Sequence, residues 1–322
     1  MADERKNAQR GEETGRDRLM DQILFFAKML PSAFMIVAPI LIAATGGMIC
    51  ERSGVVNIAL EGLMSIGAMT AAVCHVLLET KIGFSVPLAL FLSALAGGLF
   101  SLIHAFASVT LRADQVISGT GINLLSSGIT VFVCQLLFRM DRSMNYIMGM
   151  RSGIFGIYPT IWIALVILAF AWFMLYKRPW GLRLRAAGEY PQAVASAGLD
   201  VIRIRYTAVI ISGLLAGLAG GCIVLTQDIQ FTVNTINGKG FIALAAVSFG
   251  RWLPLGILGS SFLFGFSSSL AVNIINIKRL QSLPSEIFNL LPYLITLLTL
   301  VVFSGKDYAP RAAGQPYDKT IS

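Results

Sequence analysis

The chain has 322 residues, of which 56% are hydrophobic and 13% are charged, and its mean hydropathy is +0.74. Soluble domains carry about 25% charged residues, so this composition excludes an ordinary soluble protein and indicates a second, apolar solvent. The net charge of +8 does not indicate a nucleic-acid surface, because the basic residues lie between the apolar runs, as in the cytoplasmic loops of membrane proteins.

Apolar runs near or above the roughly 20 residues that a helix needs to cross a bilayer recur along the whole chain. They cover 23–49, 54–78, 84–110, 116–138, 157–176, 206–226, 240–275 and 286–304. These runs are continuous, whereas the strands of a membrane barrel are short and alternate in polarity. The sequence therefore predicts an all-α polytopic transmembrane bundle with about 8–10 membrane segments, including broken or re-entrant helices, in two pseudo-related halves.

The same pattern divides the chain into parts. Residues 1–22 form a polar tail of mixed charge, predicted to be disordered and cytoplasmic. Residues 23–305 form the membrane domain, with a cytoplasmic loop at about 177–205. Residues 306–322 form a C-terminal tail, which is also expected in the cytoplasm. The first apolar run starts late and is too long for a cleavable signal peptide, so none is expected.

The positions of the basic residues constrain the number of membrane crossings. The N-terminal tail and the loop 177–205 are both rich in Arg and Lys, so both are expected in the cytoplasm. Five simple crossings between them would put them on opposite sides, which predicts an interrupted or re-entrant element near residues 51–54. In the second half, residues 250–254 interrupt the run 240–275, and splitting that run returns the C-terminus to the cytoplasm. Interrupted helices at matching places in two halves indicate a transport path.

Glu61 is unusual because a carboxylate inside a membrane segment costs about 2.5–3.5 kcal/mol on insertion scales. Asn57 lies four residues earlier, and the two share a helical face if the helix is continuous. Two interpretations stay open: a polar patch on a transport path or gate, and a structural hydrogen bond to backbone freed at a helix break. Proton coupling is disfavoured because Glu61 has almost no ionisable neighbours within the spans.

Two further residues complete the candidates for the transport path. Asn123 lies in a span that also holds several Ser and Thr residues, a composition that favours helix packing over substrate contact. Phe241 is an aromatic residue at the start of the second interrupted run. The path candidates are therefore Asn57, Glu61, Asn123 and Phe241.

Other motifs point to packing or are absent. Gly213, Gly217 and Gly221 form a doubled GxxxG pattern, which predicts close helix contact. The four Cys residues lack paired spacing and the two His residues are isolated, so no metal site is expected. There is no GxxxxGK[ST] phosphate loop and no visible catalytic constellation. The chain is not expected to be an enzyme, and an ATPase that drives it would be another polypeptide.

The stretch GLRLRAAGEYPQAVASAGLD at 181–200 is alanine-rich and mildly basic. Pro191 suits the first turn of a short helix, and Gly198 suits its end. A short helix of small residues on the cytoplasmic side is suited to docking into a groove of a separate motor protein. The alternative is an amphipathic loop helix at the lipid surface.

Three stretches resemble the membrane permease subunits of ABC importers for ribose, branched-chain amino acids and nucleosides, most of all the shorter permease of the purine-nucleoside type. They are ERSGVVNIALEGLMSIGAMTAA at 51–72, the stretch 181–221, and GKGFIALAAVSFGRWLPLGILGSSFLFG at 238–265. The resemblance implies a bacterial inner-membrane importer with a second, longer permease, a cytoplasmic ABC ATPase and an extracytoplasmic substrate-binding lipoprotein. It also implies that the ATPase binds ATP and Mg²⁺, while this chain holds no cofactor and binds no nucleic acid.

Within this resemblance the loop 181–200 corresponds to the coupling loop, and its characteristic positions are Gly188, Glu189, Ala193, Ala197 and Gly198. Residues 189–192 read Glu-Tyr-Pro-Gln, which departs from the common Glu-Asn-Pro followed by a basic residue. A path of Asn, Ser, Thr and a few aromatic residues suits neutral purine nucleosides. Three alternatives stay open: the same machine for simple sugars or branched-chain amino acids, a secondary carrier or channel without a motor, and a membrane scaffold.

Overall fold

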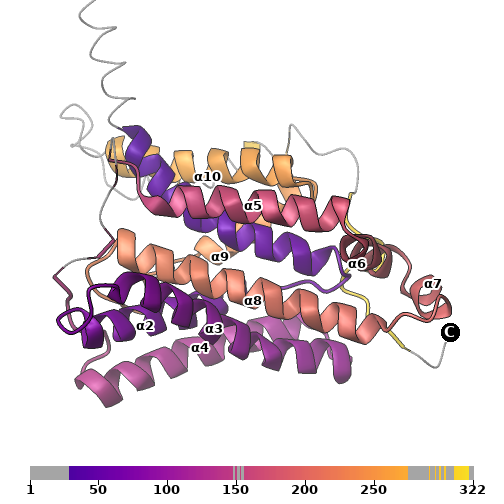
Figure 1. Cartoon of the computed structure of the whole chain (residues 1–322), viewed down its shortest axis with the longest axis horizontal. Coiled ribbons are helices and arrows are strands. Elements are labelled where there is room, and N and C mark those ends of the chain that lie inside the picture. The colour runs from indigo at the N-terminus through magenta and orange to yellow at the C-terminus, as the bar shows by residue number, and fades with distance from the viewer. Residues whose placement is uncertain are drawn as a thin grey trace, which may run out of the picture.

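The computed structural model describes residues 29–147, 149–150, 153, 156–274 and 308–318, together with positions 290, 294, 297, 298 and 301. Within these residues all regular secondary structure is helical, which confirms the predicted fold class (Figure 1). The predicted tail 1–22 and most of the predicted span 286–304 lie outside the described residues.

Seven helices of the described part are long and apolar enough to cross a membrane. They are Met29–Glu51, α2 (Leu60–Leu78), α3 (Ser85–Ala105) with the π-helical extension η1 (Phe106–Thr110), α4 (Gln115–Phe138), α5 (Pro159–Lys177), α8 (Val201–Thr226) and α10 (Pro254–Ile274). Three shorter helices are α6 (Pro179–Glu189), α7 (Pro191–Ser196) and α9 (Lys239–Phe249). Their positions confirm the apolar runs predicted for this part of the chain.

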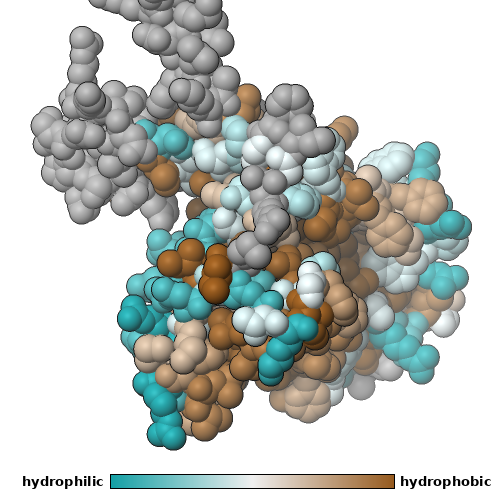
Figure 2. Space-filling view, turned by 60° about the vertical axis from the view of Figure 1, so that its left-hand side comes forward, coloured by the Kyte–Doolittle hydropathy of each residue, from teal (hydrophilic) through white to brown (hydrophobic). Residues whose placement is uncertain are grey.

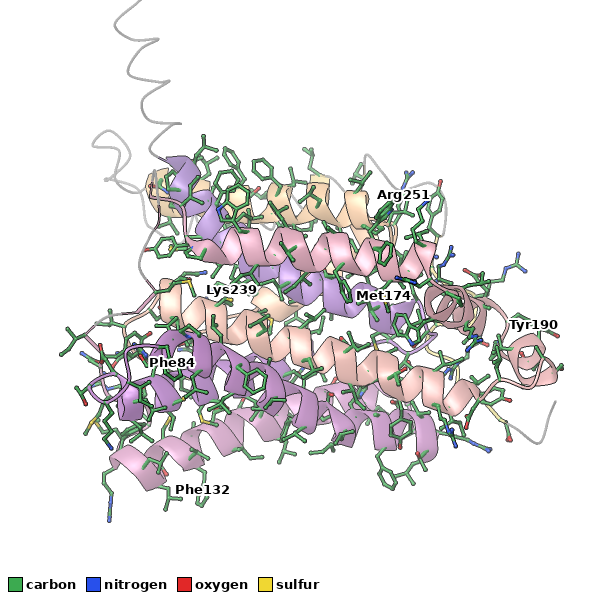
Figure 3. The ribbon with its side chains drawn as sticks, in the orientation of Figure 1. Phe84, Phe132, Met174, Tyr190, Lys239 and Arg251 are labelled. Carbon is green, nitrogen blue, oxygen red and sulfur yellow. The ribbon has the colours of Figure 1, made fainter. Side chains whose placement is uncertain are left out.

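The helices form an inner and an outer set. Met29–Glu51, α2 and α8 are buried over most of their length, whereas α3, α4 and α5 expose one side. On α4 the exposed side carries Ile117, Leu124 and Phe132, and the last of these points away from the bundle in Figure 3. Figure 2 shows hydrophobic residues over much of the surface, with hydrophilic residues at its left side, in the middle of the near face and at its right edge. This distribution suits a bundle whose sides face lipid.

Small residues allow α8 to lie against α2 and α3. A Cβ atom at Gly217 of α8 would collide with the carbonyl oxygen of Ser93 and the backbone of Gly97, both in α3. Gly67 of α2 approaches the backbone of Gly217 just as closely, and Gly213 meets Ser101 of α3 in the same way. Close approach of backbones at glycine is how membrane helices gain contact without an aqueous hydrophobic effect. The predicted packing role of the GxxxG pattern is confirmed.

A valine at Gly217 should therefore destabilise the protein strongly. We expect Gly217→Val to force α8 away from α2 and α3 and to cost about 3 kcal/mol or more, at or beyond the upper range for overpacking. Gly121→Val is the matched control, because no atom lies within 4 Å of a Cβ built at Gly121 on α4. Thermal melting in detergent measures the difference. Equal melting of the two variants would contradict this account of the contact.

In the first half of the bundle, the start of the first described helix and the loop 177–205 lie at opposite ends, whereas the prediction put the N-terminal tail and this loop on the same side. The helix Met29–Glu51 begins near Gln227 and Asn273, which lie at the end of the bundle opposite to α6 and α7. It ends beside α6, where Arg52 faces Glu189, and α2 then runs back. Because a returning helix follows, the break after Glu51 acts as a turn between two crossings. The break therefore does not bring residue 29 to the side of the loop 177–205, and the tail before it lies outside the described residues.

The second half agrees with the prediction. The run 240–275 is divided into α9 and α10, and the turn between them includes Arg251 and Trp252, both at φ 54. With 11 residues, α9 is about 16 Å long and too short to cross a bilayer of roughly 30 Å by itself. The described C-terminal residues lie at the end that carries α6, where the Ala312 N–H donates to the Gly188 carbonyl at 2.9 Å. This is the end at which the division of the run 240–275 predicted the C-terminal tail.

Candidate functional site

Two helices begin inside the bundle, and Glu61 joins them. The first N–H groups of a helix have no partner within the helix, and α9 has no side-chain cap from its own N-cap residue, Gly238. Glu61 of α2 supplies the acceptors instead: its Oε1 accepts from the Gly238 N–H and its Oε2 from the Gly240 N–H, both at 2.7 Å. Glu61 thus caps α9 from another helix.

The local charges and backbone suit this arrangement. The N-terminus of a helix carries partial positive charge, which favours a carboxylate there. Lys239, the first residue of α9, interacts electrostatically with both Glu61 and Asp228. Gly238 has φ +81, in the left-handed region, and a Cβ at Gly240 would collide with the backbone of Glu61. The two glycines therefore let the backbone reach the carboxylate.

Asn123 of α4 holds the start of α2 in a similar way. Its Oδ1 accepts from the Gly62 N–H at 2.8 Å, and its Nδ2 donates to the Ile58 carbonyl at 3.0 Å. This pair of bonds bridges the first turn of α2 and the chain before it. The prediction that Asn123 serves helix packing is consistent with these contacts.

Asn57 lies before α2 in a stretch that is not helical. The condition for a helical face shared with Glu61, a continuous helix, is not met, because the helix begins only at Leu60. The side chain is fully buried and its Nδ2 donates to the Ser212 hydroxyl of α8 at 2.8 Å. Its Oδ1 has no hydrogen-bond partner among the residues that the structure describes.

The four path candidates gather around these two helix starts. Asn57, Glu61 and Asn123 use polar groups to hold backbone or a neighbouring helix, while Phe241 is 51% exposed on the first turn of α9. These contacts support the structural interpretation of Glu61, and a path role for the four residues stays a prediction. The sequence pattern did not predict that the Gly238 and Gly240 N–H groups donate to this carboxylate. The signal was the pair of glycines around Lys239 at the start of an apolar helix.

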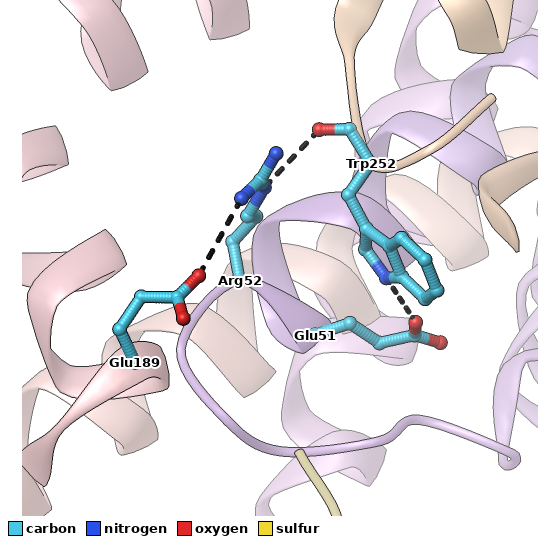
Figure 4. A network of polar contacts seen from close by, with 4 residues as sticks. All are labelled: Glu51, Arg52, Glu189 and Trp252. Carbon is cyan, nitrogen blue, oxygen red and sulfur yellow. Dashed lines mark hydrogen bonds and ion pairs between the residues drawn. The ribbon is translucent and has the colours of Figure 1, made fainter. Parts of the chain in front are cut away.

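A second polar cluster lies at the end of the bundle that carries α6 (Figure 4). The Trp252 indole Nε1 donates to buried Glu51 at 2.5 Å, and the Arg52 Nε donates to the Trp252 carbonyl at 3.2 Å. A guanidinium nitrogen of Arg52 lies 4.0 Å from the Glu189 carboxylate of α6. Arg52 therefore connects α6 with the interruption after Glu51 and with the turn between α9 and α10.

The loop predicted to carry a short helix does so. α7 begins at Pro191, and Gly198 follows it with φ +78, as predicted. The helices α6 and α7 form a hairpin whose tip projects from the bundle, as the position of Tyr190 between them shows in Figure 3. Buried Val194 holds α7 against Ala187 of α6.

The five predicted coupling residues divide into two groups. Gly188 is buried, and it packs so closely that a Cβ there would collide with the Arg52 carbonyl. Glu189, Ala193, Ala197 and Gly198 are exposed, and no atom lies within 4 Å of a Cβ built at Gly198. The loop therefore offers a surface of small side chains on a base that packs against the membrane helices. The chemistry of this surface suits close docking of another protein.

Comparison with known proteins gives concordant matches. The family model for the permease component of branched-chain amino acid transport systems matches residues 29–300. The chain is 39% identical over 316 residues to the guanosine ABC transporter permease protein NupQ of Bacillus subtilis (strain 168), covering 93% of this chain and 99% of that protein. It is 37% identical over 297 residues to the nucleoside ABC transporter permease protein NupC of Lactococcus lactis subsp. cremoris, covering 88% and 94%. It is 32% identical over 260 residues to the putative glucose ABC transporter permease protein TsgC13 of Haloferax volcanii, covering 76% and 77%.

Proposed function

Since the chain belongs to the family of permease components of branched-chain amino acid transport systems, and is thus a multi-pass ABC transporter permease subunit, we propose that it carries purine nucleosides into a bacterial cell across the inner membrane. The observation that carries the substrate class is the similarity to guanosine and nucleoside permeases over nearly the full length of both chains. The likeness to the putative glucose permease is lower and covers about three quarters of each chain.

The exposed face of α7 supports coupling to a separate motor. We place an ABC ATPase, which binds ATP and Mg²⁺, against Ala193, Ala197 and Gly198. Small side chains let a groove on the partner approach the α7 backbone, and Glu189 borders this face. A displacement of α6 then reaches Arg52 and Trp252, which lie at the two interruptions (Figure 4). Rocking of whole helices around a fixed site is the usual form of alternating access.

The path itself would lie on the side of this chain that meets a second, longer permease, with substrate delivered by an extracytoplasmic binding lipoprotein. Phe241 is the path candidate with a largely exposed side chain, and an aromatic ring suits a planar purine base. Glu61 and Asn123 already hold helix starts through hydrogen bonds. A neutral substrate is consistent with a centre whose carboxylate is occupied by backbone N–H groups.

Uptake measurements test this function directly. We expect cells with the complete transporter to accumulate radiolabelled guanosine, and unlabelled nucleosides to compete with it, whereas ribose and leucine do not. Accumulation of ribose or leucine with no competition by nucleosides would contradict the nucleoside assignment. It would favour the alternative substrates, which are simple sugars or branched-chain amino acids. Robust guanosine transport by this chain alone in liposomes, without an ATPase, would instead support a secondary carrier or channel.

A further inference from the structure

We propose that residues 308–318, here called the C-terminal strap, are a positioning element that holds α6 and α7 against the membrane helices and is required for coupling ATP hydrolysis to import. The inference rests on the proposed coupling role of α6 and α7. It concerns a segment outside the 181–200 loop, and it follows from the contacts that the strap makes with six other parts of the chain.

Backbone hydrogen bonds attach the strap to α6 and to the first interruption. The Ala312 N–H donates to the Gly188 carbonyl at 2.9 Å, and the Gly314 N–H donates to the Gly54 carbonyl at 3.2 Å. Gly54 has φ +91, and a Cβ there would lie 3.2 Å from the Ala312 carbonyl oxygen. Three segments thus meet through their backbones at positions where side chains would keep them apart.

A buried cation ties the strap to α8. Arg205 is fully buried, and its Nη1 donates to the Gln315 carbonyl at 3.0 Å. Its Nε and Nη2 have no hydrogen-bond partner within the described part of the chain. A buried guanidinium needs acceptors, so loss of the strap carbonyl would leave this charge still less satisfied. The strap is therefore an integral part of this end of the fold.

Side chains extend these contacts to the remaining elements. Tyr317 is buried in one cluster with Ala187 of α6, Val194 of α7 and Val201 at the start of α8. Asp318 pairs with Arg112, which lies between η1 and α4.

At the other end of the strap, the Arg251 guanidinium lies 4.6 Å from the ring centroid of Tyr308. The strap thus reaches the turn between α9 and α10, which also holds Trp252 of the Arg52 cluster. The Arg52–Glu189 pair and the packing of Gly188 against the Arg52 carbonyl already link α6 to the first interruption, and the strap adds direct contacts to both interruptions. We infer that the strap makes the hairpin and the helix ends move as one body.

The test compares import with ATP hydrolysis in the complete transporter, reconstituted in proteoliposomes with its ATPase and binding protein. The variants are Tyr317→Ala, the conservative Tyr317→Phe, and a chain truncated after residue 307. The control is Gln315→Ala, whose side chain is exposed and whose backbone carbonyl still accepts from Arg205. The measured quantity is radiolabelled guanosine imported per ATP hydrolysed, counted per assembled complex.

We expect this ratio to fall at least about fivefold for Tyr317→Ala and for the truncation, the low end of a coupling free energy between two sites. Tyr317→Phe and Gln315→Ala should keep the wild-type ratio. A wild-type ratio in assembled Tyr317→Ala complexes would overturn the proposal, as would a variant that only fails to assemble, because the strap would then serve stability alone. A wild-type complex that assembles without ATP-driven guanosine import would instead refute the proposed function.

Discussion

Glu61→Ala is expected to lower the free energy of unfolding of the purified permease by about 2–5 kcal/mol, since two backbone N–H groups lose a charged acceptor. The Gly238 and Gly240 N–H groups each donate to this carboxylate at 2.7 Å, inside the bundle. Nothing in the α9 N-cap replaces it. The start of α9 should therefore loosen, and thermal melting in detergent should shift downward.

Glu61→Gln should be intermediate, because an amide keeps one acceptor oxygen for the two N–H groups. We expect it to assemble with its partners and to melt between wild type and Glu61→Ala. Asp141→Asn is the matched control, because it removes an exposed carboxylate after α4. If Glu61→Ala melts like this control, the capping role is wrong. If Glu61→Gln melts like wild type but loses import, the carboxylate serves the transport path.

Ala193→Trp should abolish most ATP-driven import while leaving the folded protein intact. Ala193 is exposed on α7, so a large side chain there can extend into solvent, where it would block the groove of the proposed ATPase. A hot-spot residue near the centre of an interface changes affinity by about 2 kcal/mol or more, which is about thirtyfold, and we expect an effect of this size from an obstructing Trp. Co-purification of the ATPase and guanosine uptake should fall together.

Ala193→Ser is the control at the same position, because it keeps a small side chain, and it should behave like wild type. Gly198→Leu provides a second probe of the surface, with added backbone strain because Gly198 has φ +78. Melting of each purified variant separates loss of docking from loss of fold. Normal co-purification and uptake with Ala193→Trp would place the motor elsewhere.

Several elements of the fold were accessible from sequence because they depend on local composition. The apolar runs predicted the long helices, and Pro191 and Gly198 predicted the bounds of α7. The interruption at 250–254 followed from Gly and Pro next to charged and aromatic residues. The GxxxG pattern predicted close packing on α8, which Gly217 realises against Ser93 and Gly97.

The parity of the first half could not be predicted in the same way. Charge bias indicates the side on which a loop lies, but it does not show whether a polar break acts as a re-entrant turn or as an ordinary turn. The structure shows a turn after Glu51 followed by a returning α2. Whether Asn57 and Glu61 share a helical face was left conditional on a continuous helix for the same reason, since the position of the helix start depends on which groups are available to accept from its first N–H groups.

The sequence by itself determined an all-helical membrane bundle, its main interruptions and the short helix in its loop at 177–205, because hydropathy and helix-breaking residues act over short distances along the chain. Only the tertiary structure decided what Glu61 does. Its carboxylate binds backbone N–H groups 177 and 179 residues away, and no local pattern records such a pairing. The same holds for the strap, whose buried Tyr317 has a role only through helices more than a hundred residues earlier.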